Sequence, residues 1–159
     1  MAVKLIASDL DGTLLRNDKS ISEETGKALE KAREAGIYFV PSTGRALEAV
    51  PVEVMALPGV EYVITSNGAA VYSVSGGTRI YESLVPAEAV DALLEISMPE
   101  NMTIEVFVKG IPYTASDHVK DPARYGATAF WHRLCEKNAP SCGKHPEICE
   151  RKQRTCGQF

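Results

Sequence analysis

The sequence contains no long hydrophobic run, and its apolar stretches fall far short of the roughly 20 residues that a membrane-spanning helix needs. The first residues lack the apolar region and the small-residue cleavage site of a secretory signal. Basic residues are not in excess either, since 17 Lys and Arg stand against 21 Asp and Glu, so no basic surface indicates nucleic-acid binding. These absences predict a cytoplasmic protein without a membrane segment, and they leave the oligomeric state open.

Cysteine is missing from most of the chain and is then concentrated near its end. The four cysteines are spaced seven residues apart, at Cys135, Cys142, Cys149 and Cys156. The charge balance changes in the same region, because residues 1–131 hold 11 basic and 18 acidic side chains, whereas residues 132–159 hold six and three. The last part of the chain therefore differs in composition from the rest.

The spacing of the cysteines has two possible explanations beyond chance. A heptad repeat would place them on one helical stripe, but Pro140, Gly143 and Pro146 argue against a continuous helix. Zinc sites usually combine ligands two to four residues apart, which the cysteines do not provide. We expect residues 127–159 to be an atypical Cys-rich tail that is frame-shifted or disordered, with a zinc-dependent binding tail as the rival.

Alternating apolar segments and helical patterns run through the first half of the chain. The first apolar segment, residues 3–8, has the composition of a buried strand. A helix is expected from Ser20 or Ser22 as its N-cap to Gly36, and a second helical stretch from about Ala46, limited by prolines. The further strands are expected at residues 37–40, 62–65, 69–73 and 78–82.

This order of elements predicts an α/β fold with a parallel sheet and helical crossovers. Asp9, Thr43 and Asn67 each lie just past one of the first three strands. Because the carboxyl ends of parallel strands meet at one edge of the sheet, we expect these three residues to gather there. Beyond residue 83 the pattern changes to a small α+β unit. In it, Pro86 takes the first position of a helix, and Lys109 and Gly110 form the turn after a strand at residues 103–108.

The strongest chemical signal is the heptapeptide that follows the first strand, Asp9-Leu10-Asp11-Gly12-Thr13-Leu14-Leu15. Two carboxylates two residues apart in a tight turn can face one phosphoryl group. Asp9 would be the nucleophile that attacks phosphorus, and Asp11 would be the general acid and base. Gly12 would let the backbone approach the phosphate closely. The alternatives are a plain Asp-Gly turn and a calcium loop, and the latter would need Gly and Glu where Leu14 and Ser20 stand.

Three motifs together carry a resemblance to a known family: Asp9-Leu10-Asp11-Gly12-Thr13-Leu14, Ser42-Thr43-Gly44-Arg45 and Ser66-Asn67-Gly68-Ala69. The chain resembles the Cof-type (class IIB) haloacid dehalogenase-like phosphatases over about residues 1–126. The resemblance implies a Rossmann-like core with an inserted α+β cap, an aspartyl-phosphate intermediate and a Mg²⁺ cofactor. The partners that it implies are small phosphorylated metabolites, such as sugar phosphates or phosphorylated cofactors.

On this resemblance, residues 1–82 are the N-terminal part of the core and residues 83–126 are a partial cap. The metal ligands are the Asp9 carboxylate and the Asp11 carbonyl, and the phosphate- or substrate-binding residues are Leu10, Gly12, Thr43, Gly44, Arg45 and Asn67. Three of these residues could instead have a purely structural role. Thr43 can cap a helix, Arg45 can be a solvated charge at a helix start, and Asn67 with Gly68 can form a type I′ hairpin turn.

Two elements of the family pattern are missing from this sequence. One is a Lys that neutralises the nucleophile and the phosphoryl oxygens, and the other is a Gly-Asp-x-x-Asn/Asp turn that completes the Mg²⁺ site. We therefore expect a truncated, incomplete core with impaired phosphatase activity. Two alternatives remain open: phosphoryl transfer between sugar hydroxyls, as in phosphomutases, and a non-catalytic remnant that binds phosphate or a partner.

Overall fold

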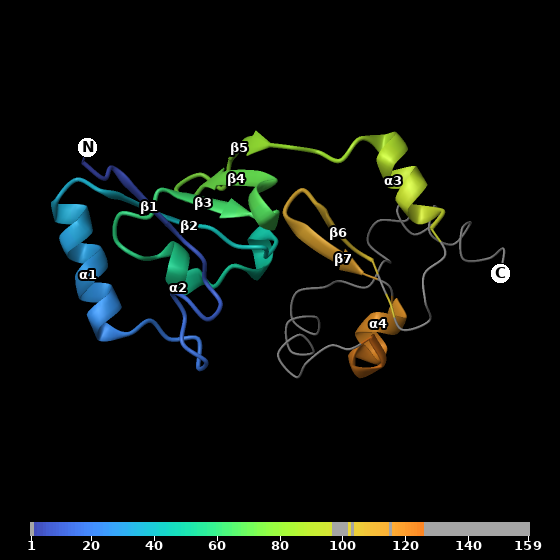
Figure 1. Cartoon of the computed structure of the whole chain (residues 1–159), viewed down its shortest axis with the longest axis horizontal. Helices are drawn as coiled ribbons and strands as arrows, with labels where there is room; N and C mark the ends of the chain where they lie inside the picture. The colour runs from blue at the N-terminus through green and yellow to red at the C-terminus, as the bar shows by residue number, and fades with distance from the viewer. Residues whose placement is uncertain (1, 97–101, 103, 115, 126–159) are drawn as a thin grey trace. The chain divides into compact units, whose positions relative to one another are not determined.

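The computed structural model describes residues 2–96, 102, 104–114 and 116–125 (Figure 1). The chain divides into two units, Met1–Ser83 and Leu84–Phe159, and each is described by itself. In the described part, no helix has the length and apolar character that crossing a membrane requires. The predicted tail at 127–159, with its four cysteines, lies outside the described residues.

The first unit is built on parallel strand pairing, as the order of elements predicted. Strand β1 (Leu5–Ser8) pairs in parallel with β2 (Tyr38–Pro41). Just past them, the Ser42 amide donates to the Ser8 carbonyl at 2.8 Å, and Ser42 forms a parallel bridge to β3 (Tyr62–Thr65). The ends of β1, β2 and β3 are thereby brought to one edge of the unit. The α/β class with a parallel sheet is confirmed.

Helix α1 (Glu23–Glu34) connects β1 to β2, and both of its ends follow from the sequence. Ser22 is the N-cap, and its hydroxyl accepts the Thr25 amide at 3.0 Å. At the other end Gly36 has a φ of 70°, and its amide and that of Ile37 donate back into the last turn, to the Arg33 and Ala32 carbonyls. This pair of hydrogen bonds is a Schellman motif, which favours glycine at the left-handed position.

The second crossover is less regular than the sequence pattern suggested. Instead of one helical stretch, the chain forms a 3₁₀ turn, η1 (Leu47–Ala49), and a single α-helical turn, α2 (Val52–Met55). Pro51 separates them because it is the N-cap of α2, with an extended ψ of 135°. A proline can begin a helix but cannot continue one, so the predicted stretch is divided at this residue.

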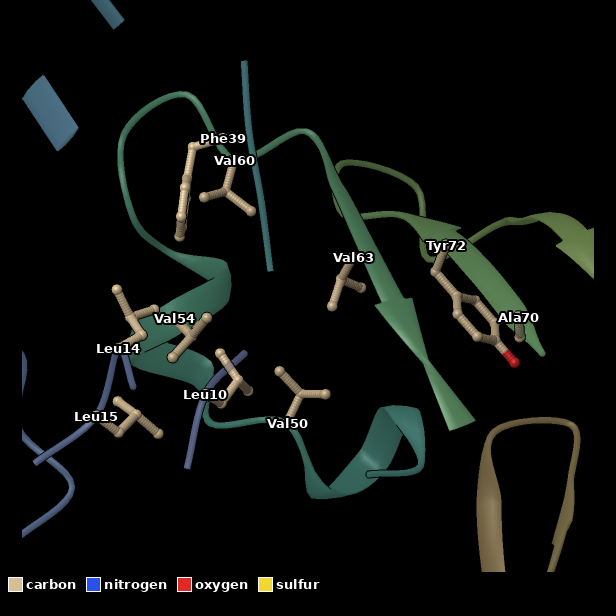
Figure 2. Close-up of a cluster of buried hydrophobic side chains, with 10 residues drawn as sticks. All are labelled: Leu10, Leu14, Leu15, Phe39, Val50, Val54, Val60, Val63, Ala70 and Tyr72. Atoms are coloured by element: carbon tan, nitrogen blue, oxygen red, sulfur yellow. The ribbon is translucent and has the colours of Figure 1, made fainter. Parts of the chain in front are cut away.

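Strand β3 also begins an antiparallel meander with β4 (Ala70–Ser73) and β5 (Arg79–Glu82), two strands that lie close to their predicted residues. The apolar core of the first unit collects side chains from the loop after β1, from β2, from the α2 region and from β3 and β4 (Figure 2). Its members are Leu10, Leu14, Leu15, Phe39, Val50, Val54, Val60, Val63, Ala70 and Tyr72. The loop after β1 therefore contributes three core residues, which anchor it to the unit.

The expectation that the first strand is buried is wrong. Leu5 is 53% exposed and Ile6 is 36% exposed, although β1 is paired as predicted. Within the described residues, β1 has a strand neighbour on one edge only, and the core of the unit lies against the loop that follows it. An apolar composition predicts a strand, but burial also requires neighbours on its faces and edges.

The second unit contains α3 (Ala87–Leu94), β6 (Glu105–Val108), β7 (Ile111–Thr114), α4 (Ser116–Lys120) and η3 (Pro122–Tyr125). Strands β6 and β7 form an antiparallel hairpin around Lys109 and Gly110, whose φ angles of 53° and 84° are those of a primed turn. Pro86 is the N-cap of α3 and not its first helical residue, because its ψ of 147° is extended.

Candidate active site

The motif after β1 forms a tight turn, and Leu10, which lies between the two aspartates, is buried. The amides of Leu14 and Leu15 donate to the carbonyls of Asp9 and Leu10, at 3.2 and 2.8 Å. Leu10 is fully buried in the core (Figure 2), whereas the neighbouring acids Asp9 and Asp11 are exposed. Gly12 has a φ of 77°, which explains the glycine at this position, because other residues rarely adopt this conformation.

Asp9 leads this turn at the carboxyl end of β1, and its side chain is exposed. Its backbone carbonyl accepts from the Leu14 amide and from the Ser8 hydroxyl, the latter at 3.0 Å. Among the hydrogen bonds of the described residues, none is donated to the Asp9 carboxylate. The carboxylate can therefore face a ligand or a cation.

Asp11 is held by Arg45, which lies 34 residues further along the chain. The guanidinium donates to both carboxylate oxygens, with Nε 2.8 Å from Oδ2 and Nη2 2.7 Å from Oδ1. Nη1 donates to the Ala49 carbonyl at 2.8 Å, and the Arg45 side chain is only 9% exposed. This contact joins the loop after β1 to the loop after β2, at the edge where Asp9, Thr43 and Asn67 are predicted to gather.

Lys19 is a second cation on Asp11, and sequence reasoning missed it. Its ammonium lies 2.9 Å from Oδ1, and its backbone has a φ of 68°, which is uncommon for a side chain other than glycine. The hydrogen bond from Arg45 lowers the pKa of Asp11; partial burial opposes this effect, and the hydrogen bond from Lys19 adds to it. The contacts with Arg45 and Lys19 therefore favour the ionised form of Asp11. The only signal for Lys19 was its position in a polar turn eight residues after Asp11.

Thr43 is buried at the end of β2, and its amide donates to the Ile64 carbonyl at 3.0 Å. Its hydroxyl oxygen accepts the Arg45 backbone amide at 3.2 Å, which is a local turn contact and not the helix cap of the structural explanation, because the N-cap of η1 is Ala46. A hydroxyl can donate one hydrogen bond while it accepts another. This turn contact therefore leaves Thr43 able to donate to a phosphoryl oxygen.

Asn67 lies against the backbone of Gly44. A Cβ atom on Gly44 would be 2.7 Å from the Asn67 Oδ1 atom, so only glycine allows this approach. The backbone amide of Asn67 also donates to the Thr43 carbonyl at 3.2 Å. Asn67 and Gly68 lie in the connection between the antiparallel strands β3 and β4, but residues 66–69 form it, which is longer than the two-residue type I′ turn of the hairpin explanation, and Ser66, Asn67 and Gly68 all have a positive φ.

Contacts among the described residues thus bring the predicted residues together in two groups. Asp11 and Arg45 form one group with Lys19, and Thr43, Gly44 and Asn67 form the other; the chain links them because Gly44 and Arg45 are neighbours. Asp9 is joined to them through the turn that also contains Asp11. The described residues contain no cluster of three or more His, Cys, Asp or Glu side chains that could hold a metal ion. The loop offers a cation two hard oxygens, the Asp9 carboxylate and the Asp11 carbonyl.

Comparison with known proteins gives a consistent result. A family model described as haloacid dehalogenase-like hydrolase matches residues 6–140. An HMP-PP phosphatase of Klebsiella pneumoniae is 29% identical over 154 residues, covering 91% of this chain and 56% of that protein. Phosphatase YwpJ of Bacillus subtilis is 38% identical over 112 residues, covering 70% of this chain and 39% of that protein. The chain thus spans about half the length, or less, of these curated relatives.

Solved structures share the fold. The HAD subclass IIB sugar phosphatase BT4131 superposes with a TM-score of 0.67 at 25% identity, covering 87% of this chain and 52% of that chain. A haloacid dehalogenase-like hydrolase from B. subtilis superposes with a TM-score of 0.61 at 28% identity, covering 92% of this chain and 56% of the other. The motifs after β1, β2 and β3 therefore lie in a fold that these enzymes have in common.

Proposed function

The chain belongs to the haloacid dehalogenase-like hydrolase family, and we propose that it forms part of a Mg²⁺-dependent, cytoplasmic phosphatase of small phosphorylated metabolites. The observation that carries this proposal is the turn after β1, which leaves Asp9 exposed beside Asp11 and anchors both through the buried Leu10. The names of the relatives support the substrate class, since they include an HMP-PP phosphatase and a sugar phosphatase.

In the first step, a carboxylate oxygen of Asp9 attacks phosphorus, and the bond between phosphorus and the leaving oxygen breaks. The leaving oxygen takes a proton from Asp11, and the product on the protein is an aspartyl phosphate. An exposed Asp9, to which no group in the described residues donates, suits this role because its lone pairs are available.

In the second step, Asp11 accepts a proton from water, and the water oxygen attacks phosphorus. The bond to Asp9 breaks, which releases inorganic phosphate and restores the carboxylate. The lowered pKa of Asp11, caused first by the Arg45 hydrogen bond, favours the ionised form that this step requires. The protonated form that the first step requires needs Asp11 to be released from its cations.

The remaining predicted residues would bind the phosphoryl oxygens and the substrate. The Thr43 hydroxyl can donate one hydrogen bond, and the planar guanidinium of Arg45 can donate two parallel ones. Asn67 would present its carboxamide beside Gly44, where the glycine makes room for it. Positioning and charge stabilisation by such groups account for most of the catalysis of phosphoryl transfer.

Mg²⁺ would be held by the Asp9 carboxylate and the Asp11 carbonyl. Both are hard oxygen ligands, and no hydrogen bond among the described residues occupies either of them. When bound, the ion would neutralise negative charge on the phosphoryl group. Two protein ligands fit an ion that usually keeps several waters. We further propose that residues 83–126 begin an α+β cap that selects the substrate.

The test is Mg²⁺-dependent phosphate release by the 159-residue chain over a panel of sugar phosphates and phosphorylated cofactors, compared with Asp9→Asn. We expect all turnover to require Asp9, and we expect beryllofluoride, a mimic of the phosphoryl group, to bind the parent chain but not the variant. Glu30→Gln, on the exposed face of α1, is the control for loss of one carboxylate. Measurable phosphate release that is equal in the parent chain and Asp9→Asn would refute the proposal. Isomerised sugar phosphate without release of phosphate would favour a mutase.

A further inference from the structure

The loop after β3 contains three consecutive residues in the left-handed backbone conformation. Ser66, Asn67 and Gly68 have φ angles of 52°, 55° and 91°. Glycine adopts such angles readily and asparagine tolerates them, but a serine with a positive φ is uncommon. The Ala69 amide donates to the Ser66 carbonyl at 3.1 Å and closes the turn. Ser66 therefore has a conformation that its residue type does not favour, and contacts with the surrounding structure must maintain it.

The left-handed turn directs two successive backbone amides toward the loop after β2. In an extended strand successive N–H groups point in opposite directions, whereas in a helical conformation of either hand they point the same way. The Ser66 amide donates to the Arg45 carbonyl at 2.9 Å, and the Asn67 amide donates to the Thr43 carbonyl at 3.2 Å. These two acceptors lie on either side of Gly44, so the turn holds the segment from Thr43 to Arg45 at both of its ends.

The side chain of Asn67 adds a third contact to the same segment. Its Oδ1 atom lies so close to the Gly44 backbone that a Cβ atom on Gly44 would be 2.7 Å from it. The Ser66 hydroxyl, in contrast, takes part in no hydrogen bond among the described residues. Ser66 thus holds the segment through its backbone amide, and the direction of that amide depends on the left-handed conformation.

We propose that Ser66 is a positioning residue of the phosphate site, and that its left-handed backbone holds Thr43 and Arg45 where their side chains can meet a phosphoryl group. Thr43 is buried and the Arg45 side chain is only 9% exposed, so packing prevents either side chain from rotating to compensate for a displaced backbone. A segment that is already held also loses less freedom when it binds a ligand. The nature of the ligand rests on the proposed function, whereas the hold of the turn on the loop after β2 does not.

The competing explanation is that the Ser66 hydroxyl itself contacts the phosphate. Two substitutions separate the hydroxyl from the backbone. Ser66→Gly removes the hydroxyl but adopts a positive φ without cost. Ser66→Thr keeps the hydroxyl, but its side chain is branched at Cβ, and such residues almost never have a positive φ. The two explanations therefore predict opposite results for this pair of variants.

The test measures binding of inorganic phosphate in the presence of Mg²⁺, so that it does not depend on turnover. Phosphate is titrated into the isotope-labelled 159-residue chain, and its affinity is measured from the backbone amide signals of Thr43 and Arg45 by NMR. Ser66→Gly should match the affinity of the parent chain within about twofold. Ser66→Thr should bind phosphate roughly three- to tenfold more weakly, the range that corresponds to the loss of about one hydrogen bond to the anion.

The matched control is Gly77→Thr in the hairpin between β4 and β5. Gly77 is exposed, has a left-handed φ of 60°, and has no atom within 4 Å of an added Cβ, so the variant creates the same backbone strain away from the site. It should lose stability and leave the phosphate affinity of the folded chain unchanged. A second readout needs no ligand. The NMR signal of the Arg45 Nε–H, which donates to Asp11, should shift in Ser66→Thr but not in Ser66→Gly or in the control.

Three results would overturn the inference. Weaker phosphate binding by Ser66→Gly together with normal binding by Ser66→Thr would assign the role to the hydroxyl. Unchanged binding by both variants would show that the turn does not position the site. A loss of affinity in Gly77→Thr as large as that in Ser66→Thr would reduce the effect to lost stability.

Two further outcomes are also decisive. If Ser66→Thr does not fold, Ser66→Gly decides alone, because unchanged phosphate binding supports the backbone role and weaker binding excludes it. If the parent chain binds no phosphate, the proposed function is at fault, and the Arg45 Nε–H signal decides the positioning role. A shift confined to Ser66→Thr then supports that role, and an unshifted signal overturns it.

Discussion

Replacing Gly44 with alanine would place a methyl group against the side chain of Asn67. The new Cβ atom would lie 2.7 Å from Oδ1, 3.4 Å from Cγ and 3.5 Å from Nδ2 of Asn67. The first of these distances is too short for any real contact, so one group must move. The backbone of Gly44 does not have a positive φ, so alanine itself can adopt its conformation.

The cost to stability should be small, because the obstructing atom is the end of an exposed, flexible side chain. Moving Asn67 to an ordinary contact requires a shift of about 0.7 Å, and an off-rotamer side chain costs about 0.5–1.5 kcal/mol. Reduced freedom of the unfolded chain favours alanine by about 0.4–1 kcal/mol. The two effects nearly cancel, so we expect the free energy of unfolding to change by less than about 1 kcal/mol while the carboxamide moves.

The measurement combines urea denaturation with the NMR signals of the Asn67 side-chain amide. Gly26→Ala is the matched control, since Gly26 lies inside α1 with no atom within 4 Å of its added Cβ. It should stabilise the chain by about 0.5–1 kcal/mol and leave the Asn67 signals in place. Unshifted Asn67 signals in Gly44→Ala, or a loss of stability above about 2 kcal/mol, would contradict the reasoning.

Three further predictions concern stability. A double-mutant cycle of Asp11→Asn and Arg45→Met, measured by urea denaturation, should give a coupling energy of about 1–2 kcal/mol. This value exceeds that of a usual surface ion pair because Arg45 is nearly buried and contacts both carboxylate oxygens. A coupling energy near zero would contradict this prediction. The pKa of Asp11 is lower in the folded than in the unfolded protein, so ionised Asp11 should stabilise the fold above about pH 4. This stabilisation should be lost as the pH falls through the folded pKa. If the parent chain and Asp11→Asn lose stability in parallel as the pH falls, the prediction is wrong. Ser22→Ala should destabilise the chain by about 1 kcal/mol, as read from its denaturation midpoint, since the cap of α1 is lost.

Local signals in the sequence were sufficient for most of the elements. The strand Tyr62–Thr65 lies at its predicted residues, and the Lys109-Gly110 turn has the positive φ angles that its hairpin requires. Gly36 ends its helix as predicted. Each of these depends on a few adjacent residues, whose conformational preferences can be read directly from the chain.

What could not be predicted depends on contacts between distant residues. The exposure of Leu5 is set by which neighbours flank β1, and the apolar composition of the strand carries no information about them. The ion pair of Arg45 with Asp11 joins residues 34 positions apart. Lys19 contacts the same carboxylate from a left-handed backbone conformation. The positions of the motifs predict that Asp9, Thr43 and Asn67 gather at the sheet edge, but they carry no information about the pairing of Asp11 with Arg45 and Lys19.

The Asp11–Arg45 pair also closes a loop of the chain that contains α1 and β2. Any fluctuation that separates β2 from β1 must break this pair together with the ladder between the two strands. Strands β4 and β5 lie outside the closed loop, and within the described part of the chain they pair only with β3 and with each other. Slow amide hydrogen exchange in β1 and β2 should therefore report on the state of the site, whereas exchange in the meander should be independent of it.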